Sequence, residues 1–385
     1  MSYRFFAASV ILLPMCHGSY FAIPIGTLGG QSHASSINHS GVVGGYSATA
    51  AGNTHGFVWS NGVMTEIGTL GGGNSFLEAL NETGQGAGIS YTTGNATQEA
   101  FLLTTGGGLF GIGSLGGPES TANGLSDAFP GNGQSLLVSV VGTSRTVGGF
   151  FDFTRHAFLW TGLAAGGGGA MLDLGTLSGG NSGANAINNS GRIAGWSTVG
   201  SSDSAPSHAV YWENNFITDL GTLGGSHSVA YGINENGQIV GGAYNVTNTM
   251  HAFLWDGAMM DLGSLGGYSQ AYDVNNAGQV VGDSSLVNGT IHGFVWEGGT
   301  MSDLNTLLLN PFGPGVYLMT ATAINDAGYI TAGTNDGRAF LLVPDAPGTP
   351  EPASLILTGG GLGVLIALRR RTRGGAREGR PRLRS

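Results

Sequence analysis

The residues best suited to chemistry in this 385-residue chain are histidines that recur at one position of a repeated segment. The segment reads HAFLW, HGFVW or a close variant, and its histidines are His55, His156, His208, His251 and His292. Imidazole is a common metal ligand, so a shared metal site is the chemistry that they suggest. Equivalent positions on a ring of repeats radiate outward and cannot meet at one ion. We therefore expect structural histidines bonded to a neighbouring repeat, and no metal or other cofactor.

Carboxylates and tryptophans recur in the same way. The carboxylates Asp173, Asp219, Asp261 and Asp303 lie in segments such as MLDLG, where we expect them to bond turns. The tryptophans Trp59, Trp160, Trp212, Trp255 and Trp296 share one repeat position and are predicted to pack between repeats. Trp196 falls outside that position and is a candidate for stacking on a sugar. The sequence contains no H-E-x-x-H, G-x-S-x-G or calcium-loop pattern.

These residues belong to a unit that occurs seven times. Its landmark, GTLGG or a near copy, begins at Gly26, Gly68, Gly113, Gly175, Gly221 and Gly263, with a degenerate copy, NTLLL, at Asn305. The longest spacing contains insertions around residues 126–154 and the glycine run 166–169. Each unit holds four short apolar or alternating segments bounded by Gly, Asn and Asp, which predicts four strands.

The fifth copy shows how the strands are connected. Its predicted strands are residues 228–234, 237–243, 251–255 and 259–265. In the turn INENGQ, Asn234 can bond its own backbone and Gly237 can take a positive φ, while Gly257 marks a second tight turn. The glycine-rich landmark suits a chain that crosses from the outer edge of one sheet to the inner edge of the next. Four strands and one crossover make a β-propeller blade.

The two ends of the repeat region are predicted to complete a ring. The seventh copy has three strands, at residues 320–325, 328–334 and 338–343, and lacks an outer strand. Residues 21–28, FAIPIGTL, match the outer-strand register of FITDLGTL at 216–223. We therefore predict an all-β, seven-bladed β-propeller of four-stranded repeats over residues 21–343, closed by residues 21–28 so that no inner edge is unpaired.

A ligand site of such a ring is expected in the central channel, where inner strands begin and crossover loops meet. The candidate ligand-binding residues there are His33, Glu78, His227, Tyr231 and Tyr272. We assign no residue to catalysis or to metal binding.

Charge and targeting signals set the compartment. Between residues 21 and 343, four arginines oppose 20 acidic residues, a formal net charge of −16, so nucleic acid and anionic lipid are not expected partners. Arg4, the apolar run FFAASVILL and the small residues near Gly18 predict a secretory signal peptide over residues 1–18. The single cysteine, Cys16, lies inside it, which leaves the mature chain without disulfides.

The repeats resemble a known family. The segments THGFVW, RHAFLW, SHAVYW, MHAFLW and IHGFVW, together with DLGTLGG and INxxG, are similar to the HAF repeat of extracellular bacterial proteins, and the likeness covers residues 21–343. Copies two and seven depart from it, with Glu99 and Arg338 at the histidine position. The resemblance implies an exported repeat protein and supplies no catalytic residues.

The C-terminal region resembles the PEP-CTERM sorting signal. Its parts are Pro350, Glu351 and Pro352, the apolar segment 353–368, and the cluster Arg369, Arg370 and Arg371. The resemblance implies a linker at 344–352, a transient membrane helix at 353–368, a cytoplasmic tail at 369–385, and an exosortase-type enzyme that removes the tail. The 16 apolar residues are short for a lipid core that needs about 20. An ordinary anchor that is never cut is the alternative.

These features predict a non-enzymatic protein of the cell surface or extracellular matrix, exported across the inner membrane, that binds exopolysaccharide or another protein. The alternative is a propeller-type extracellular glycan lyase or hydrolase. A close-set pair of acidic groups, or of His and Tyr, in the channel would favour the enzyme. A channel without such a pair would favour the binding protein. A calcium-stabilised scaffold is a third class, although the chain has no dense Asp motif.

Overall fold

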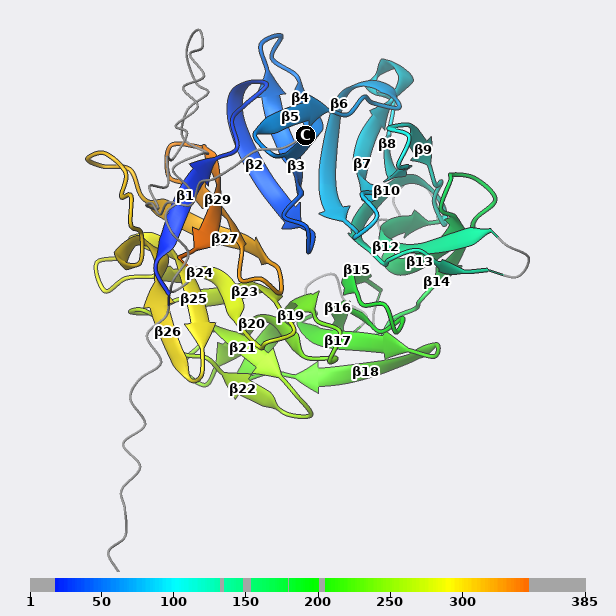
Figure 1. The fold of residues 1–385 in the computed structure, drawn as a ribbon. Coiled ribbons are helices and arrows are strands. Elements are labelled where there is room, and N and C mark those ends of the chain that lie inside the picture. The colour runs from blue at the N-terminus through cyan, green and yellow to red at the C-terminus, as the bar shows by residue number, and fades with distance from the viewer. Residues whose placement is uncertain (1–17, 132–134, 148–153, 179, 201–204, 346–385) are drawn as a thin grey trace, which may run out of the picture. The chain divides into compact units, whose positions relative to one another are not determined.

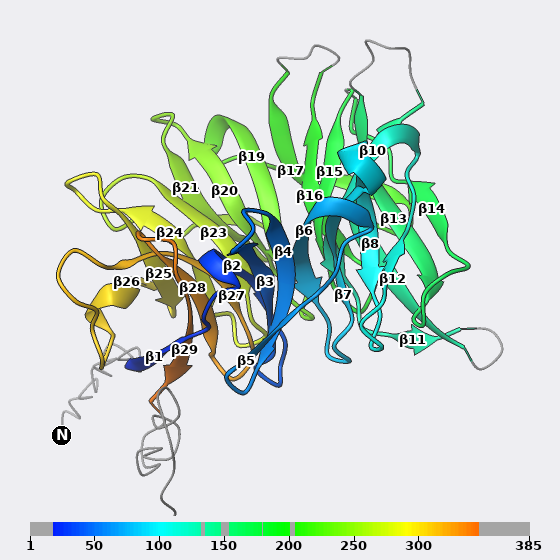
Figure 2. The same cartoon turned by 90° about the horizontal axis from the view of Figure 1, so that it is seen from above.

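The strands of the computed structural model form seven sheets arranged in a ring (Figure 1). The structure describes residues 18–131, 135–147, 154–178, 180–200 and 205–345. Turning the ring by 90° shows the blades side by side (Figure 2). The predicted all-β, seven-bladed propeller is therefore confirmed. The predicted signal peptide up to residue 17, the linker from residue 346 onward, the sorting helix and the arginine tail lie outside the described residues. Within the described residues no helix has the length and apolar character needed to cross a membrane.

Each blade is built on four strands, which follow one another in sequence order from the channel outward except in the seventh blade, where β1 is the outer strand. The inner strands are β2 (Gly29–Ile37), β6 (Gly71–Leu80), β10 (Gly116–Leu125), β15 (Ser182–Ile187), β19 (Gly224–Ile233), β23 (Ser269–Val274) and β27 (Leu318–Ile324). The second strands are β3 (Val43–Thr49), β7 (Gly86–Thr92), β12 (Leu136–Thr146), β16 (Ile193–Thr198), β20 (Ile239–Asn245), β24 (Val280–Ser285) and β28 (Ile330–Thr334). The third strands are β4 (Thr54–Ser60), β8 (Gln98–Leu103), β13 (Arg155–Leu163), β17 (Ser207–Glu213), β21 (Met250–Trp255), β25 (Ile291–Glu297) and β29 (Ala339–Pro344). The outer strands are β5 (Val63–Glu66), β9 (Leu109–Gly111), β14 (Ala170–Asp173), β18 (Phe216–Gly221), β22 (Met259–Asp261), β26 (Thr300–Asp303) and, for the seventh blade, β1 (Tyr20–Pro24).

Three short elements accompany these strands. The third blade has a fifth strand that the repeat did not predict, β11 (Phe129–Pro130), which pairs with β12 inside the predicted insertion. The 3-10 turns η1 (Thr93–Asn95) and η2 (Leu304–Thr306) lie in connecting loops.

The predicted side-chain bond of Asn234 and the predicted glycine turns are confirmed. The Gln238 N–H donates to Asn234 Oδ1 at 2.9 Å, and Gly237 has a φ of 80°. Gly257 has a φ of 79° in the second turn. The outer strand is shorter than predicted, because β22 ends at Asp261 where the chain begins to cross to the next blade.

Every inner strand carries a bulge at the same repeat position, where the pairing register skips one residue. The residues at this position are Ser35, Glu78, Asn123, Asn185, Tyr231, Tyr272 and Thr322. The bulge brings an inner-strand carbonyl close to the second strand. At Gly241 a Cβ would lie 2.0 Å from the Val229 carbonyl oxygen, so this position requires glycine. The bulge on the inner strand therefore requires the glycine on the second strand.

The blades pack through apolar clusters that join neighbouring sheets. Trp212 of the fourth blade is 1% exposed, lies in a cluster with Val141 of the third blade, and donates from Nε1 to the Leu174 carbonyl at 2.9 Å. Trp160 packs in the same way against Leu102 of the second blade. The predicted role of the repeated tryptophans between blades is confirmed at these positions.

The ring closes as predicted, through the N-terminal strand. β1 pairs antiparallel with β29, from Tyr20 opposite Pro344 to Pro24 opposite Phe340. The other edge of β1 is covered by the crossover after the sixth blade. The Tyr20 N–H donates to the Leu307 carbonyl at 2.9 Å, and the Asn310 side chain bonds the Ala22 N–H and carbonyl at 2.8 and 3.0 Å. The degenerate copy of the landmark thus has a second task, protecting the edge of the closing strand.

The repeated histidines have a different partner from the one expected. Nδ1 of His251 lies 2.9 Å from the Asp261 carboxylate on the outer strand of its own blade, and the other four histidines pair likewise within their blades. The prediction of a bond to the neighbouring repeat was wrong for this ring nitrogen, because the third and outer strands are themselves adjacent. Nε2 of His55 does reach the next blade, where it lies 3.2 Å from the Gly73 carbonyl. Asp261 also accepts the Gly263 N–H at 2.8 Å, which confirms the predicted turn-bonding role of the repeated carboxylates.

Replacing His251 by alanine is expected to lower the free energy of unfolding by about 1 kcal/mol, the value of one ordinary hydrogen bond. The effect stays small because each blade contact is local in a repeat protein. Denaturant unfolding of the wild type and the variant measures it, with elemental analysis of the purified protein alongside. Stoichiometric zinc or copper, or a loss of several kcal/mol, would contradict the structural role.

Candidate functional site

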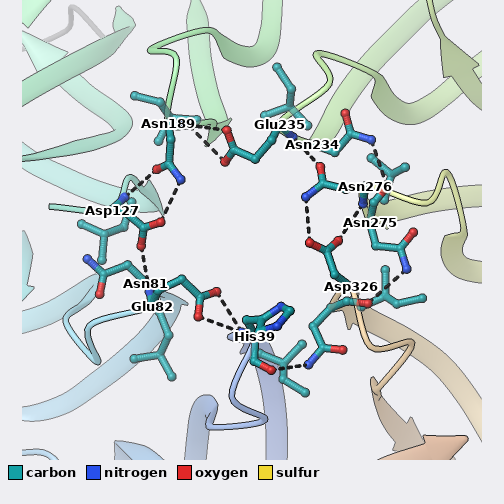
Figure 3. Close-up of a pocket in the computed structure, with 18 residues that line it drawn as sticks. His39, Asn81, Glu82, Asp127, Asn189, Asn234, Glu235, Asn275, Asn276 and Asp326 are labelled. Atoms are coloured by element: carbon teal, nitrogen blue, oxygen red, sulfur yellow. Dashed lines mark hydrogen bonds between the residues drawn. The ribbon is translucent and has the colours of Figure 1, made fainter. Parts of the chain in front are cut away.

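One hollow lies at the end of the channel where the inner strands finish, and we call it the channel floor (Figure 3). It has a volume of about 490 Å³ and is ringed by the residues that follow the repeated Asn, which is replaced by Ser126 in the third copy: His39, Glu82, Asp127, Asn189, Glu235, Asn276 and Asp326. Six of them donate their backbone N–H to the side chain of the equivalent residue in the next blade, as His39 does to Glu82 at 2.8 Å. A second set of bonds runs beneath, and Asn325 to the Asn38 carbonyl at 3.0 Å joins the last blade to the first.

The polar side chains of the channel floor form hydrogen bonds between neighbouring blades. Its carboxylates accept backbone N–H groups, and burial, helped by the charges of Asp127 and Asp326, raises the pKa of Glu235. Across the described part of the chain, no group of three or more His, Cys, Asp or Glu side chains is placed to hold a metal ion. The bonds of the floor hold neighbouring blades in register.

The channel wall contains the predicted candidate residues in separate groups. Tyr231 and Tyr272 come together, with ring centroids 5.7 Å apart. His33 stacks on Tyr46 at 4.9 Å. His227 lies apart from both groups, bonded to Ser226 and edge-on to Tyr244. The structure therefore does not gather the five predicted residues into one site.

Two residues that the sequence did not single out complete the tyrosine group. The Tyr272 hydroxyl donates to Asp283 at 2.8 Å, and the Tyr268 hydroxyl donates to Gln270 at 2.5 Å. Burial, with the charge of Asp283 as the second cause, raises the pKa of Tyr268 and of Tyr272. Burial also raises the pKa of Asp283. These tyrosines are therefore neutral hydrogen-bonding groups at neutral pH and are poorly suited to act as bases.

Glu78 occupies the bulge position at which most other blades place a hydrogen-bond donor. The donors at this position each reach a carbonyl of the next blade: Ser35 to Leu77, Asn123 to Ala184, Asn185 to Ala230 and Thr322 to Ala34. An ionised carboxylate has no hydrogen to donate. Burial raises the pKa of Glu78 to about 7, so near neutrality a large fraction of this group keeps its proton.

A second hollow, which we call the groove, lies at the opposite end of the strands, across the second, third and fourth blades. Its volume is about 600 Å³. Its lining combines an indole with hydroxyl, amide and charged groups from Gln98, Glu119, Ser120, Thr121, Thr143, Arg145, Arg155, Asn181, Trp196, Thr198, Ala205 and Ser207.

Trp196 lies partly exposed in this groove. It faces Gly183 on the inner strand of the same blade, where a Cβ would come within 2.6 Å of Trp196 Nε1. The missing side chain at Gly183 is what lets the indole lie against the backbone. Among the described residues, Trp196 Nε1 has no hydrogen-bond partner, so it is a donor available to a ligand.

The charged part of the groove is an arginine–glutamate cluster. Glu119 Oε2 lies 3.2 Å from Arg145 Nε and 3.2 Å from Arg155 Nη2. Arg155 is held at its backbone, where its N–H donates to Asn181 Oδ1 of the next blade at 3.0 Å. Its side chain is 51% exposed. The groove can therefore offer an aromatic face, an indole donor and a guanidinium to one ligand.

No family model matches the chain, and no curated protein matches it. Solved structures resemble it in fold. The β-propeller domain of the Trilobed protease from Pyrococcus furiosus has a TM-score of 0.46 at 11% identity, covering 82% of this chain and 94% of that chain. Pyrococcus horikoshii acylaminoacyl peptidase has a TM-score of 0.44 at 11% identity, covering 78% of this chain and 49% of the peptidase, about half its length. Aleuria aurantia lectin in complex with α-methyl-L-fucoside has a TM-score of 0.35 at 11% identity, covering 74% of this chain and 94% of the lectin. The likeness concerns fold, and no functional residue is carried over.

The groove contains one residue that the sequence singled out and several that it did not. The structure places Trp196 in the groove, and the sequence analysis did not single out Glu119 and Arg155, which line it as well. A signal was present in the sequence. Two of the four arginines of residues 21–343 are at the insertion of the third repeat, because Arg145 lies within residues 126–154 and Arg155 directly follows them.

The sorting-motif residues Pro350, Glu351, Pro352, Arg369, Arg370 and Arg371 lie outside the described residues.

Proposed function

We propose that the chain is an exported, non-enzymatic protein of the cell surface or extracellular matrix whose propeller binds a polysaccharide in the groove. The observation that carries this proposal is the partly exposed indole of Trp196 among hydroxyl, amide and charged side chains in a hollow of about 600 Å³. An indole offers a flat apolar face for a sugar ring, and convergent polar groups fix the orientation of its hydroxyls.

Replacing Trp196 by alanine is expected to weaken polysaccharide binding by about tenfold or more, as for an aromatic residue at the centre of a binding site. A glycan array finds the ligand, and calorimetry with wild type and variant measures the loss. Phe216→Ala is the matched control, because Phe216 is an aromatic residue 76% exposed on the outer strand of the same blade, outside the groove. Equal losses in the two variants, or binding to a protein with no glycan bound, would contradict a polysaccharide site at Trp196.

Export and processing form the second part of the proposal, and they rest on the sequence signals at the two chain ends. We expect the mature protein to lack the arginine tail, because a Pro-Glu-Pro motif precedes an apolar segment too short for comfortable permanent residence in a bilayer. Intact-mass analysis of the extracellular fraction from the native host measures the C-terminus. A secreted species that still ends at Ser385 would contradict removal by an exosortase-type enzyme.

A glycan lyase or hydrolase is the second candidate, and the tyrosine group favours it. Tyr231, Tyr268, Tyr272 and Asp283 form the close-set polar group in the channel that an enzyme would need. The raised pKa of the tyrosines fits hydrogen bonding better than proton abstraction, which places this candidate second. New reducing ends or unsaturated sugars after incubation with the glycan ligand would support the enzyme.

A further inference from the structure

We propose that the groove selects a carboxylated sugar, a uronic acid, and that Arg155 is the residue that recognises the carboxylate. The inference deepens the polysaccharide binding proposed above and rests on it. It names the charge class of the ligand and the side chain that determines it.

The geometry of Arg155 leaves part of its guanidinium available. Nη2 bonds Glu119 at 3.2 Å, while Nε and Nη1 have no partner among the described residues. A guanidinium presents two edges that each fit a carboxylate bidentately. Glu119 engages the guanidinium through one nitrogen and holds it in the groove, and a second carboxylate can bind through the remaining N–H groups.

Of the other three arginines of the propeller, Arg145 shares Glu119 with Arg155 and is only 21% exposed, and Arg192 and Arg338 each bond a carboxylate through two nitrogens. Arg192 donates to Glu213 from Nε at 3.2 Å and from Nη2 at 3.0 Å, and its guanidinium lies over the ring of Tyr211. Arg338 bonds Asp336 through Nε and Nη2 and lies over Phe340. Arg155 is therefore the more open anion-recognition group, in a groove that also holds a partly exposed indole.

The negative net charge of the ring makes a local cation such as Arg155 necessary for binding an acidic sugar. Residues 21–343 carry a formal net charge of −16, so an acidic polymer is repelled by most of the surface. Attraction has to come from short contacts at a particular place. A uronic acid joins a carboxylate to the same ring whose apolar face stacks on an indole, and Arg155 and Trp196 line one groove. A neutral sugar would use Trp196 and leave the N–H groups of Arg155 that do not bond Glu119 without a partner.

The test titrates the full chain with a panel of galacturonate, glucuronate and mannuronate oligosaccharides and with the same oligosaccharides after their carboxyl groups are reduced to alcohols. We expect the wild type to prefer at least one acidic form over its reduced form by about tenfold, the size of one charge-assisted contact. Arg155→Gln should abolish that preference, so that the acidic form and its reduced form bind this variant with equal affinity. Arg155→Lys should restore part of it, because an ammonium keeps the charge and loses the fork.

Arg338→Gln is the matched control, since it removes one arginine from another blade and should keep the preference. Equal affinity for every acidic and reduced pair, a preference that survives Arg155→Gln, or an equal loss in Arg338→Gln overturns the inference. If Trp196→Ala still weakens binding in those cases, the proposed polysaccharide binding stands. If neither acidic nor reduced forms bind and the glycan array is empty, the proposed function fails together with the inference.

Discussion

Deletion of residues 20–24 is expected to lower the melting temperature by about 10 °C or more, because the seventh blade loses its outer strand and the ring loses its closure. β1 supplies five paired positions to β29. It also buries Tyr20, which is 4% exposed and packs in the cluster of the sixth and seventh blades. Losing a buried aromatic residue with its strand costs on the order of 5 kcal/mol. For a protein of this size, each kcal/mol corresponds to roughly 2 °C.

Asn310→Ala is the graded control for this deletion. It removes the two hydrogen bonds that Asn310 makes to Ala22 and leaves β1 in place. We expect a loss of about 1–2 kcal/mol and a drop of only a few degrees. Calorimetric melting of the three proteins compares them directly. A deletion variant that melts at the wild-type temperature would show that β1 does not close the ring.

Replacing Glu78 by glutamine is expected to stabilise the protein at pH 8 and to have much less effect at pH 4. Burial raises the pKa of Glu78 from 4.5 to about 7 in the folded ring. The unfolded chain therefore ionises first, and the wild type loses stability as pH rises from 4.5 through about 7. Glutamine has no such titration, and its amide can donate to the next blade as Asn123 and Asn185 do. We expect a gain on the order of 2 kcal/mol, or about 4 °C, at pH 8.

Melting curves at intervals from pH 4 to 8 measure this difference. Glu297→Gln is the matched control, because it makes the same chemical change on the third strand of the sixth blade, away from the inner-strand bulges. Curves for wild type and Glu78→Gln that stay parallel over the whole range would show that Glu78 is not held protonated by its surroundings.

The fold was predictable because a strand assignment made in one repeat can be checked against the other six copies. One unit read from residues 221–265 applies to the other copies, so the turn at Asn234, the crossover at Gly263 and the closing strand all followed from the same pattern. The bulge did not follow from it. The bulge depends on a skipped register, which a pattern of alternating side chains does not show. The partner of the histidines was also missed, because strand adjacency alone does not say which of two neighbours an imidazole faces.

The groove was harder to predict for a related reason. Trp196, Tyr46 and Asp283 occupy one equivalent position of the second strand, each directly after the glycine that the bulge requires. The predictions used the residues that the repeats share, whereas Trp196, Tyr46 and Asp283 lie at a position where the repeats differ. The residue after this glycine changes from copy to copy between constant neighbours. Such variation within a repeated frame is the signal that points to Trp196 and Asp283.

Closure by the first strand also imposes an order on biogenesis. β1 is synthesised before any complete blade, yet its partner β29 is the last of the described strands to be made. Until then, a growing chain carries an apolar strand with no sheet to join, which is the form most exposed to aggregation and proteolysis. A chain that ends early never buries it. Burial of β1 therefore distinguishes complete chains from truncated ones, because β1 is paired only when β29 is present.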